Sequence, residues 1–240
     1  MPDLHKAGVV YLAAIGNFFY QSNGFVKFYN EMYPYWKCVP VAVLILFVAL
    51  HGAKLPLKTR VLLTIGLTGG CIGDYFIGIE QNGIIPGAVV FGIQHILYLL
   101  TFVPDTLRVC WPLVGALLAW NAVVGHFCMM PAINVVGFPS VALMSVYGLI
   151  LSSGLIFSAS QALYGSKKHP AYSPPILWRL LGFVSFVISD NCLIHDWSGF
   201  HVPYSEAIIL ITYFSSQYLF VRASISSEWH SKKAKKTKSK

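Results

Sequence analysis

The chain has 240 residues, of which 56% are hydrophobic and only 11% are charged. Soluble domains carry about 25% charged residues, so this chain has too little charge to cover a water-facing surface. Its formal net charge of +8 does not indicate a nucleic-acid partner, because six of the 17 lysines and arginines lie in the last nine residues and most others lie in short loops. The composition therefore excludes a soluble domain and predicts an all-α integral membrane protein.

Eight apolar segments have about the length that a helix needs to cross the hydrocarbon core of a bilayer. The first is the weakest, since it is short and is interrupted by Asn17 and Gln21. No long polar segment separates the spans, so we expect one transmembrane helical domain over residues 1–225 and a lysine-rich cytoplasmic tail over 226–240. The predicted spans are 7–21, 37–52, 61–79, 85–103, 109–127, 140–162, 176–195 and 204–223.

The loops between these spans alternate in charge. Positively charged residues favour the cytoplasmic side of a membrane, so the alternation predicts that both termini are cytoplasmic, as an even number of spans requires. Lys27 and Lys37 fall on the opposite side and are minor exceptions. The loops after the second, fourth and sixth spans carry Lys54, Lys58, Arg60, Arg108, Lys167 and Lys168, whereas those after the third, fifth and seventh carry no lysine or arginine.

The chain ends in a lysine-rich segment whose last five residues read K-T-K-S-K. Lys236 and Lys238 have the spacing of a dilysine signal that retrieves membrane proteins to the endoplasmic reticulum. A polybasic segment that attracts anionic lipid is the equally weighted alternative. The signal would place the protein in the endoplasmic reticulum membrane, among membrane lipids.

Two aspartates lie inside otherwise apolar spans, Asp74 in the third and Asp190 in the seventh. A charged side chain at the bilayer centre costs roughly 2.5–3.5 kcal/mol, so such residues are candidates for function. Both spans run in the same direction, and each aspartate lies about 14 residues, or roughly 21 Å, from the cytoplasmic end. The two carboxyl groups are thus expected at similar depth in the membrane, where they could share a site.

Other polar side chains are candidates for the same site. Gly66, Gly70 and Gly78 leave the helix face around Asp74 nearly free of side chains, which lets neighbouring helices approach closely. The fourth span carries Gln94, and its His95 and Tyr98 share one face. The remaining candidates are Asn191, beside Asp190, and Tyr213 and Gln217 in the last span. The residues predicted to bind the substrate are His95, Tyr98, Asn191, Tyr213 and Gln217.

No motif for a bound metal is present. The histidines include no pair at i and i+4, which weakens a zinc-hydrolase interpretation. The cysteines form no CxxC pair and are expected to be ordinary buried thiols. They are Cys38, Cys71, Cys110, Cys128 and Cys192.

Four segments, "GDYFIG", "FGIQHILY", "FVISD" and "VPYSEAIILITYFSSQ", resemble the YhhN-type lysoplasmalogenases, the transmembrane protein 86 group, over roughly residues 38–225. The resemblance implies a membrane enzyme of about eight helices that hydrolyses the vinyl ether bond of lysoplasmalogens. The products are a fatty aldehyde and glycerophosphocholine or glycerophosphoethanolamine. The resemblance also implies that Asp74 and Asp190 are the catalytic pair, and it includes His95, Tyr213 and Gln217. The first span and the loop "HDWSGFH" show no such likeness, so roles for Asp196 and Glu206 stay open.

The chemistry of a vinyl ether suits two carboxyl groups. Protonation of its β-carbon gives an oxocarbenium ion, to which water adds before the hemiacetal collapses. One carboxylic acid and one carboxylate in a low-dielectric bundle can supply the proton and stabilise the positive charge, as in glycosidases. This reaction requires no metal or organic cofactor. The alternatives are a proton-coupled transporter, because intramembrane aspartates also form proton relays, and, more weakly, a zinc-dependent lipid amidase.

Overall fold

The structure is a computed structural model that describes residues 2–51 and 54–238. Its apolar runs form helices, because a helix satisfies its backbone hydrogen bonds internally where no water is available. The helices are α1 (Pro2–Gln21), α2 (Tyr33–Leu46), α3 (Leu57–Ile79), α4 (Ile84–Phe102), α5 (Trp111–Val124), α6 (Met130–Val136), α7 (Phe138–Tyr164), α8 (Pro174–Trp197) and α9 (Ser205–Lys238). Single π-helical turns extend α2 over Phe47–His51 and join α5 to α6 over Gly125–Met129.

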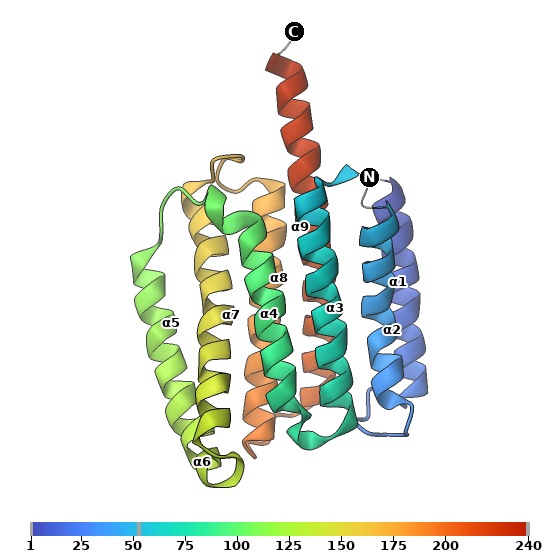
Figure 1. The fold of residues 1–240 in the computed structure, drawn as a ribbon, viewed down its shortest axis with the longest axis vertical. Helices are drawn as coiled ribbons and strands as arrows, with labels where there is room; N and C mark the ends of the chain where they lie inside the picture. The colour runs from blue at the N-terminus through green and yellow to red at the C-terminus, as the bar shows by residue number, and fades with distance from the viewer. Residues whose placement is uncertain (1, 52–53, 239–240) are drawn as a thin grey trace.

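The long helices stand side by side and alternate in direction, so that both ends of the chain lie at the same end of the bundle (Figure 1). α3 packs against α2 and α4, α7 packs against α4 and α8, and α8 packs against α9. α5 lies at the edge of the bundle, where it packs on α7 and contributes no buried residue. The extension of α9 projects beyond the other helices (Figure 1).

Seven segments of the described residues are long and apolar enough to cross a membrane. They comprise α2 with its π-helical turn, α3, α4, the α5–α6 segment, α7, α8 and α9. α1 corresponds to the predicted first span and runs alongside the others (Figure 1), but it is not one of the seven. The chain is an integral membrane protein with the polytopic helical architecture that the sequence predicts.

Two helix ends differ from the predicted spans on the side opposite the termini. α2 begins at Tyr33 rather than residue 37, since Pro34 is favourable in a first helical turn, where its missing N–H is not needed. Lys37 therefore lies about one turn inside the helix rather than at the edge of the span. The segment after residue 127, expected to be a loop, is largely helical through Val136, because the π-helical turn and α6 continue α5.

At the other end, α9 does not stop at residue 223 but continues as one helix to Lys238. The predicted tail is thus helical over most of its length. The segment after residue 222 is rich in alanine, serine and lysine, and it contains no proline or glycine that would end the helix.

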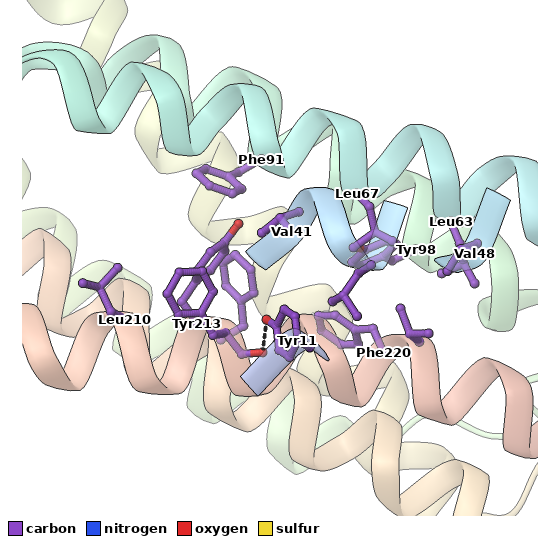
Figure 2. Close-up of a cluster of buried hydrophobic side chains, with 14 of the residues drawn as sticks. Tyr11, Val41, Val48, Leu63, Leu67, Phe91, Tyr98, Leu210, Tyr213 and Phe220 are labelled. Atoms are coloured by element: carbon purple, nitrogen blue, oxygen red, sulfur yellow. Dashed lines mark hydrogen bonds between the residues drawn. The ribbon is translucent and has the colours of Figure 1, made fainter. Parts of the chain in front are cut away.

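Aromatic and aliphatic side chains from α1, α2, α3, α4, α8 and α9 fill the centre of the bundle (Figure 2). Glycines on α3 allow this packing. A Cβ atom at Gly66 would lie 2.7 Å from the ring of Tyr98, and one at Gly70 would lie 2.6 Å from the side chain of Gln94. These positions therefore bring α4 close to α3, as expected for small residues on a membrane helix.

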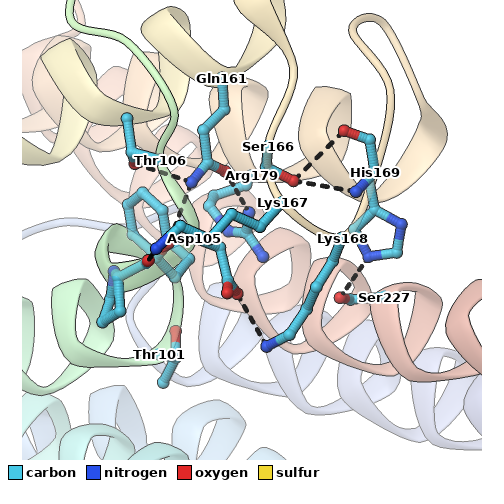
Figure 3. A network of polar contacts seen from close by, with 12 residues as sticks. Thr101, Asp105, Thr106, Gln161, Ser166, Lys167, Lys168, His169, Arg179 and Ser227 are labelled. Atoms are coloured by element: carbon cyan, nitrogen blue, oxygen red, sulfur yellow. Dashed lines mark hydrogen bonds and ion pairs between the residues drawn. The ribbon is translucent and has the colours of Figure 1, made fainter.

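A polar network joins the α4–α5 and α7–α8 loops (Figure 3), which lie at the end of the bundle that holds the termini (Figure 1). Lys168 forms an ion pair with Asp105 at 2.8 Å, and the buried Arg179 donates a hydrogen bond to Gln161 at 2.9 Å. His169 contacts Ser227 of α9 at 2.7 Å. Burial, and next the nearby Arg179, lower the pKa of His169, which favours a neutral imidazole in this contact.

Candidate active site

Asp74 lies on α3 and is buried, with an exposed fraction of 1%. Tyr213 of α9 donates a hydrogen bond to its Oδ2 atom at 2.6 Å. The ammonium group of Lys37, on α2, lies 3.9 Å from its Oδ1 atom. Side chains of three helices thus meet at this carboxylate, and one of them carries the opposite charge.

Asp190 lies on α8 and is partly buried. Its Oδ2 atom accepts a hydrogen bond from the hydroxyl group of Tyr147, on α7. Among the described residues, no lysine, arginine or histidine forms an ion pair with it. The two aspartates therefore differ in surroundings, since Asp74 has a cationic partner and Asp190 has a neutral one.

Both aspartates line one small cavity of about 20 Å³. This volume is sufficient for one water molecule, which also needs two to four polar partners. The cavity offers such partners. Its lining residues are Lys37, Asp74, Ile77, Phe91, Ser189, Asp190, Leu193, Glu206, Ile209, Leu210 and Tyr213.

A second cavity, of about 300 Å³, lies between α4, α5, α7 and α8. Its walls are mostly apolar, with leucine, isoleucine, valine and methionine side chains from these helices and from the π-helical turn after α5. Leu118 and Leu149 line this cavity and are 52% and 44% exposed, so it reaches the protein surface within the membrane-spanning part. The size and lining are those of a site for a small, largely apolar ligand.

The larger cavity has a few polar groups in its wall besides Asp190. Trp120 donates a hydrogen bond to the predicted site residue Asn191 at 2.8 Å, and Asn121 donates one to Ser152 at 2.7 Å. Asp190 lines both cavities, whereas Asp74 lines only the small one. The two cavities share a wall formed by Ile77, Phe91, Asp190 and Leu193.

Three predicted site residues lie outside both cavities. Tyr98 and Gln217 form a separate buried cluster with Gln94, with hydrogen bonds of 2.8–3.0 Å. His95 is fully buried, and neither ring nitrogen has a hydrogen-bond partner among the described residues. Its ring packs edge-on against Phe186, with the centroids 4.3 Å apart. Their assignment to substrate binding remains a prediction.

Sequence reasoning did not include two residues that contact the aspartates. Lys37 was treated as a minor exception to the charge pattern at the edge of the second predicted span, because the start of that helix was placed too late. Tyr147 lies in an apolar run of α7 that carries no charge and no recognisable motif. Glu206, whose role was open, lines the small cavity and accepts a hydrogen bond from Tyr33 at 2.8 Å. In the described part of the chain, no group of three or more histidine, cysteine or acidic side chains lies close enough together to hold a metal ion.

Fold and site together define a polytopic membrane protein with two carboxyl groups beside an apolar cavity. The model of the YhhN family matches residues 32–224, which is most of the chain and includes both aspartates. The chain belongs to the YhhN family.

Two curated relatives are similar to it. The protein named lysoplasmalogenase TMEM86A of Bos taurus is 27% identical over 213 residues, which cover 85% of this chain and 84% of that protein. The protein of the same name from Homo sapiens is 26% identical over 220 residues, with the same shares. No solved structure matches the chain.

Proposed function

We propose that this protein is a lysoplasmalogenase, an ether hydrolase that cleaves the vinyl ether bond of lysoplasmalogens. The products are a fatty aldehyde and glycerophosphocholine or glycerophosphoethanolamine. The observation that carries the proposal is that Asp74 and Asp190 line one small polar cavity, which shares a wall with a larger apolar one. The name of the two curated relatives supports it. The name of these relatives gives no support to the alternative function, a proton-coupled transporter.

The arrangement of polar and apolar groups suits this substrate. A lysoplasmalogen has one long hydrocarbon chain, and its reactive double bond lies between that chain and the polar glycerol. The apolar walls of the larger cavity can bind the chain, while Asp190 and Asn191 supply polar groups on one side. Hydrolysis needs an acid, a water molecule and an anion that stabilises the oxocarbenium ion, and two carboxyl groups beside a water-sized cavity can provide them.

The decisive experiment is a direct assay. Purified protein in detergent is given lysoplasmenylcholine or lysoplasmenylethanolamine, and released aldehyde is measured with and without a chelator. We expect release in both conditions. The lysophospholipid with a saturated ether in place of the vinyl ether is the substrate control, because it cannot form an oxocarbenium ion by protonation. No aldehyde from either vinyl ether lipid would contradict the proposed function.

We also propose that the protein resides in the endoplasmic reticulum with both termini in the cytoplasm. The spacing of Lys236 and Lys238 supports this location. Changing both lysines to serine should move part of the protein to later compartments, as seen by fluorescence microscopy. The matched control changes Lys233 and Lys235 to serine, which removes the same charge but keeps the spacing. If both variants have the same distribution, the segment acts through its positive charge alone and not as a retrieval signal.

A further inference from the structure

We propose that the two aspartates have different tasks. Asp190 is the acid that protonates the vinyl ether, and Asp74, held by Lys37, activates a water molecule bound in the small cavity. This inference rests on the proposed function and assigns the roles within it. It identifies the small cavity as the water site and Lys37 as a positioning residue.

The first argument is access. A proton donor must lie within hydrogen-bond reach of the atom that it protonates. Of the two cavities described, that of about 300 Å³ is large enough to hold part of a lipid, and of the two aspartates Asp190 lines it and Asp74 does not. Asp74 lines the cavity of about 20 Å³, which excludes the substrate by its size. Asp190 is therefore the aspartate that touches the vinyl ether.

The second argument is the chemistry of the small cavity. It has room for one water molecule, and the charged or acidic residues that line it are Lys37, Asp74, Asp190 and Glu206. Of the three acidic residues, Asp74 is the one that forms an ion pair with Lys37 in the described part of the chain. Because Asp190 also forms the wall toward the lipid, a water molecule here adjoins the carbon that becomes an oxocarbenium ion. The water is thus next to both its base and its target.

The third argument is charge. Lys37 lies 3.9 Å from Asp74, and both side chains are almost completely buried. This ion pair offsets the negative charge that Asp74 needs as a base. Asp190 receives only the neutral hydroxyl of Tyr147 and forms no ion pair within the described residues. A neutral carboxylic acid suits these surroundings, since an unpaired charge is costly to bury.

The proton balance closes over one turnover. Asp190 gives its proton to the β-carbon, which leaves an oxocarbenium ion and a carboxylate. Water adds to the α-carbon while Asp74 takes one of its protons, and a hemiacetal forms. Asp190 takes the proton of the hemiacetal hydroxyl and delivers it to the glycerol oxygen as the bond between carbon and that oxygen breaks. The proton on Asp74 then returns to Asp190 through a water molecule in the small cavity that both residues line. Both residues regain their starting states, and one water molecule is consumed.

Isotope exchange in heavy water separates the two tasks. With Asp74→Asn, Asp190 still transfers a deuteron to the β-carbon, but without activated water the ion returns to the vinyl ether. Deuterium should therefore accumulate at the vinyl β-carbon of recovered substrate, seen by mass spectrometry, while aldehyde release is lost. With Asp190→Asn both signals should be lost. A general acid contributes about 10²–10⁴-fold, so exchange should be at least about 100-fold slower than in Asp74→Asn.

Lys37 is tested with the same readout. Lys37→Met should resemble Asp74→Asn, with exchange retained and hydrolysis impaired, and Lys37→Arg should recover part of the hydrolysis because it restores the charge. The double variant Lys37→Met/Asp74→Asn removes both charges, so it tests exchange without an unpaired ion. Asp105→Asn is the matched control, since that carboxylate lies in the loop after α4 with Lys168, and should hydrolyse as the wild type does.

The outcomes distinguish this inference from the proposed function. A wild type that releases no aldehyde contradicts the function, and the role assignment falls with it. A wild type that releases aldehyde, with no exchange in folded Asp74→Asn or in the double variant, contradicts the role assignment alone. Exchange in Asp190→Asn that equals or exceeds that in Asp74→Asn would reverse the roles.

Discussion

Lys37 of α2 and Asp74 of α3 form an ion pair inside the bundle, with side chains only 4% and 2% exposed. Removing two charges from water costs several kcal/mol for each ion, and their attraction offsets this cost only while both are present. The pair therefore links the register of α2 and α3 to the charge of a candidate catalytic residue. Loss of either partner should affect stability as well as activity.

Lys37→Met should lower the free energy of unfolding by about 3–5 kcal/mol, because it leaves a buried carboxylate unpaired. Lys37→Met/Asp74→Asn should recover much of this loss. The matched control is Lys168→Met at the 2.8 Å pair with Asp105, where Lys168 is 52% exposed and an exposed pair contributes about 0–1 kcal/mol. Thermal unfolding in detergent measures all three. Equal losses of stability in Lys37→Met and Lys168→Met would show that the buried ion pair contributes no more to stability than the exposed one.

Asp74→Asn and Asp190→Asn should each lower vinyl ether hydrolysis by at least about 100-fold while leaving membrane insertion intact, since asparagine can neither deliver a carboxylic proton nor carry the countercharge. The double variant should be little worse than the worse single one, because the two groups act as a unit. Aldehyde release by purified variants of matched thermal stability is the measurement. More than about a tenth of wild-type turnover in either variant would refute the acid–base pair.

His95→Gln should have a smaller effect, roughly 10-fold on turnover, below the 10²–10⁴-fold of a general acid. The ring of His95 stacks on Tyr147, with centroids 6.1 Å apart, and Tyr147 in turn donates to Asp190. Its contribution is therefore expected through the position of Tyr147. His95→Phe retains a ring of similar shape and is the control. A loss in His95→Phe as large as in Asp190→Asn would instead assign chemistry to the imidazole.

Much of this architecture follows from sequence periodicity and charge. Long apolar runs and alternating basic loops predict the helices, and an equal distance from the helix starts predicts that Asp74 and Asp190 lie at similar depth. Asp74 stands out because a carboxylate inside a glycine-rich apolar run has few structural explanations. The side chains that complete its surroundings are less visible. Tyr147 is a tyrosine among many, and its contact with Asp190 depends on how α7 packs against α8.

The cavities could not be predicted from the sequence. Their walls combine residues from α3, α4, α5, α7, α8 and α9, and their volumes depend on how closely those helices approach. The sequence grouped Tyr98 and Gln217 with the aspartates because they share apolar spans with other candidates. In the structure they form hydrogen bonds with Gln94 instead. Tyr98 lies against Gly66 and Gln94 against Gly70, so this cluster is about one to two helical turns away from Asp74 along α3. The distance between polar groups on different helices depends on how those helices pack, which the sequence does not give.

Both termini should be accessible from the cytosol. They lie at one end of the bundle (Figure 1), and the basic loops at that end favour the cytoplasmic side. Epitope tags at each terminus should bind antibody after selective permeabilisation of the plasma membrane. A tag in the loop between α8 and α9 is the matched control and should stay protected. Protection of either terminal tag would contradict the predicted orientation and the depth inferred for the aspartates.

The last prediction concerns the cavity of about 300 Å³ as the binding site for the lipid chain. Gly125 lines this cavity, and a Cβ atom there would meet nothing within 4 Å. Gly125→Phe can therefore fill the space without forcing the helices apart. Misfit in an apolar pocket is worth about 1–3 kcal/mol, so kcat/KM should fall by roughly 10-fold or more.

Gly115 provides a matched control for this substitution. It lies on α5, a Cβ atom there also meets nothing within 4 Å, and it lines neither cavity. Gly115→Phe should retain the wild-type kcat/KM, and both variants should keep their thermal stability. A saturated-ether lysophospholipid should also inhibit Gly125→Phe less strongly than Gly115→Phe, because binding itself is impaired. Equal inhibition and equal kcat/KM in the two variants would mean that the lipid chain binds elsewhere.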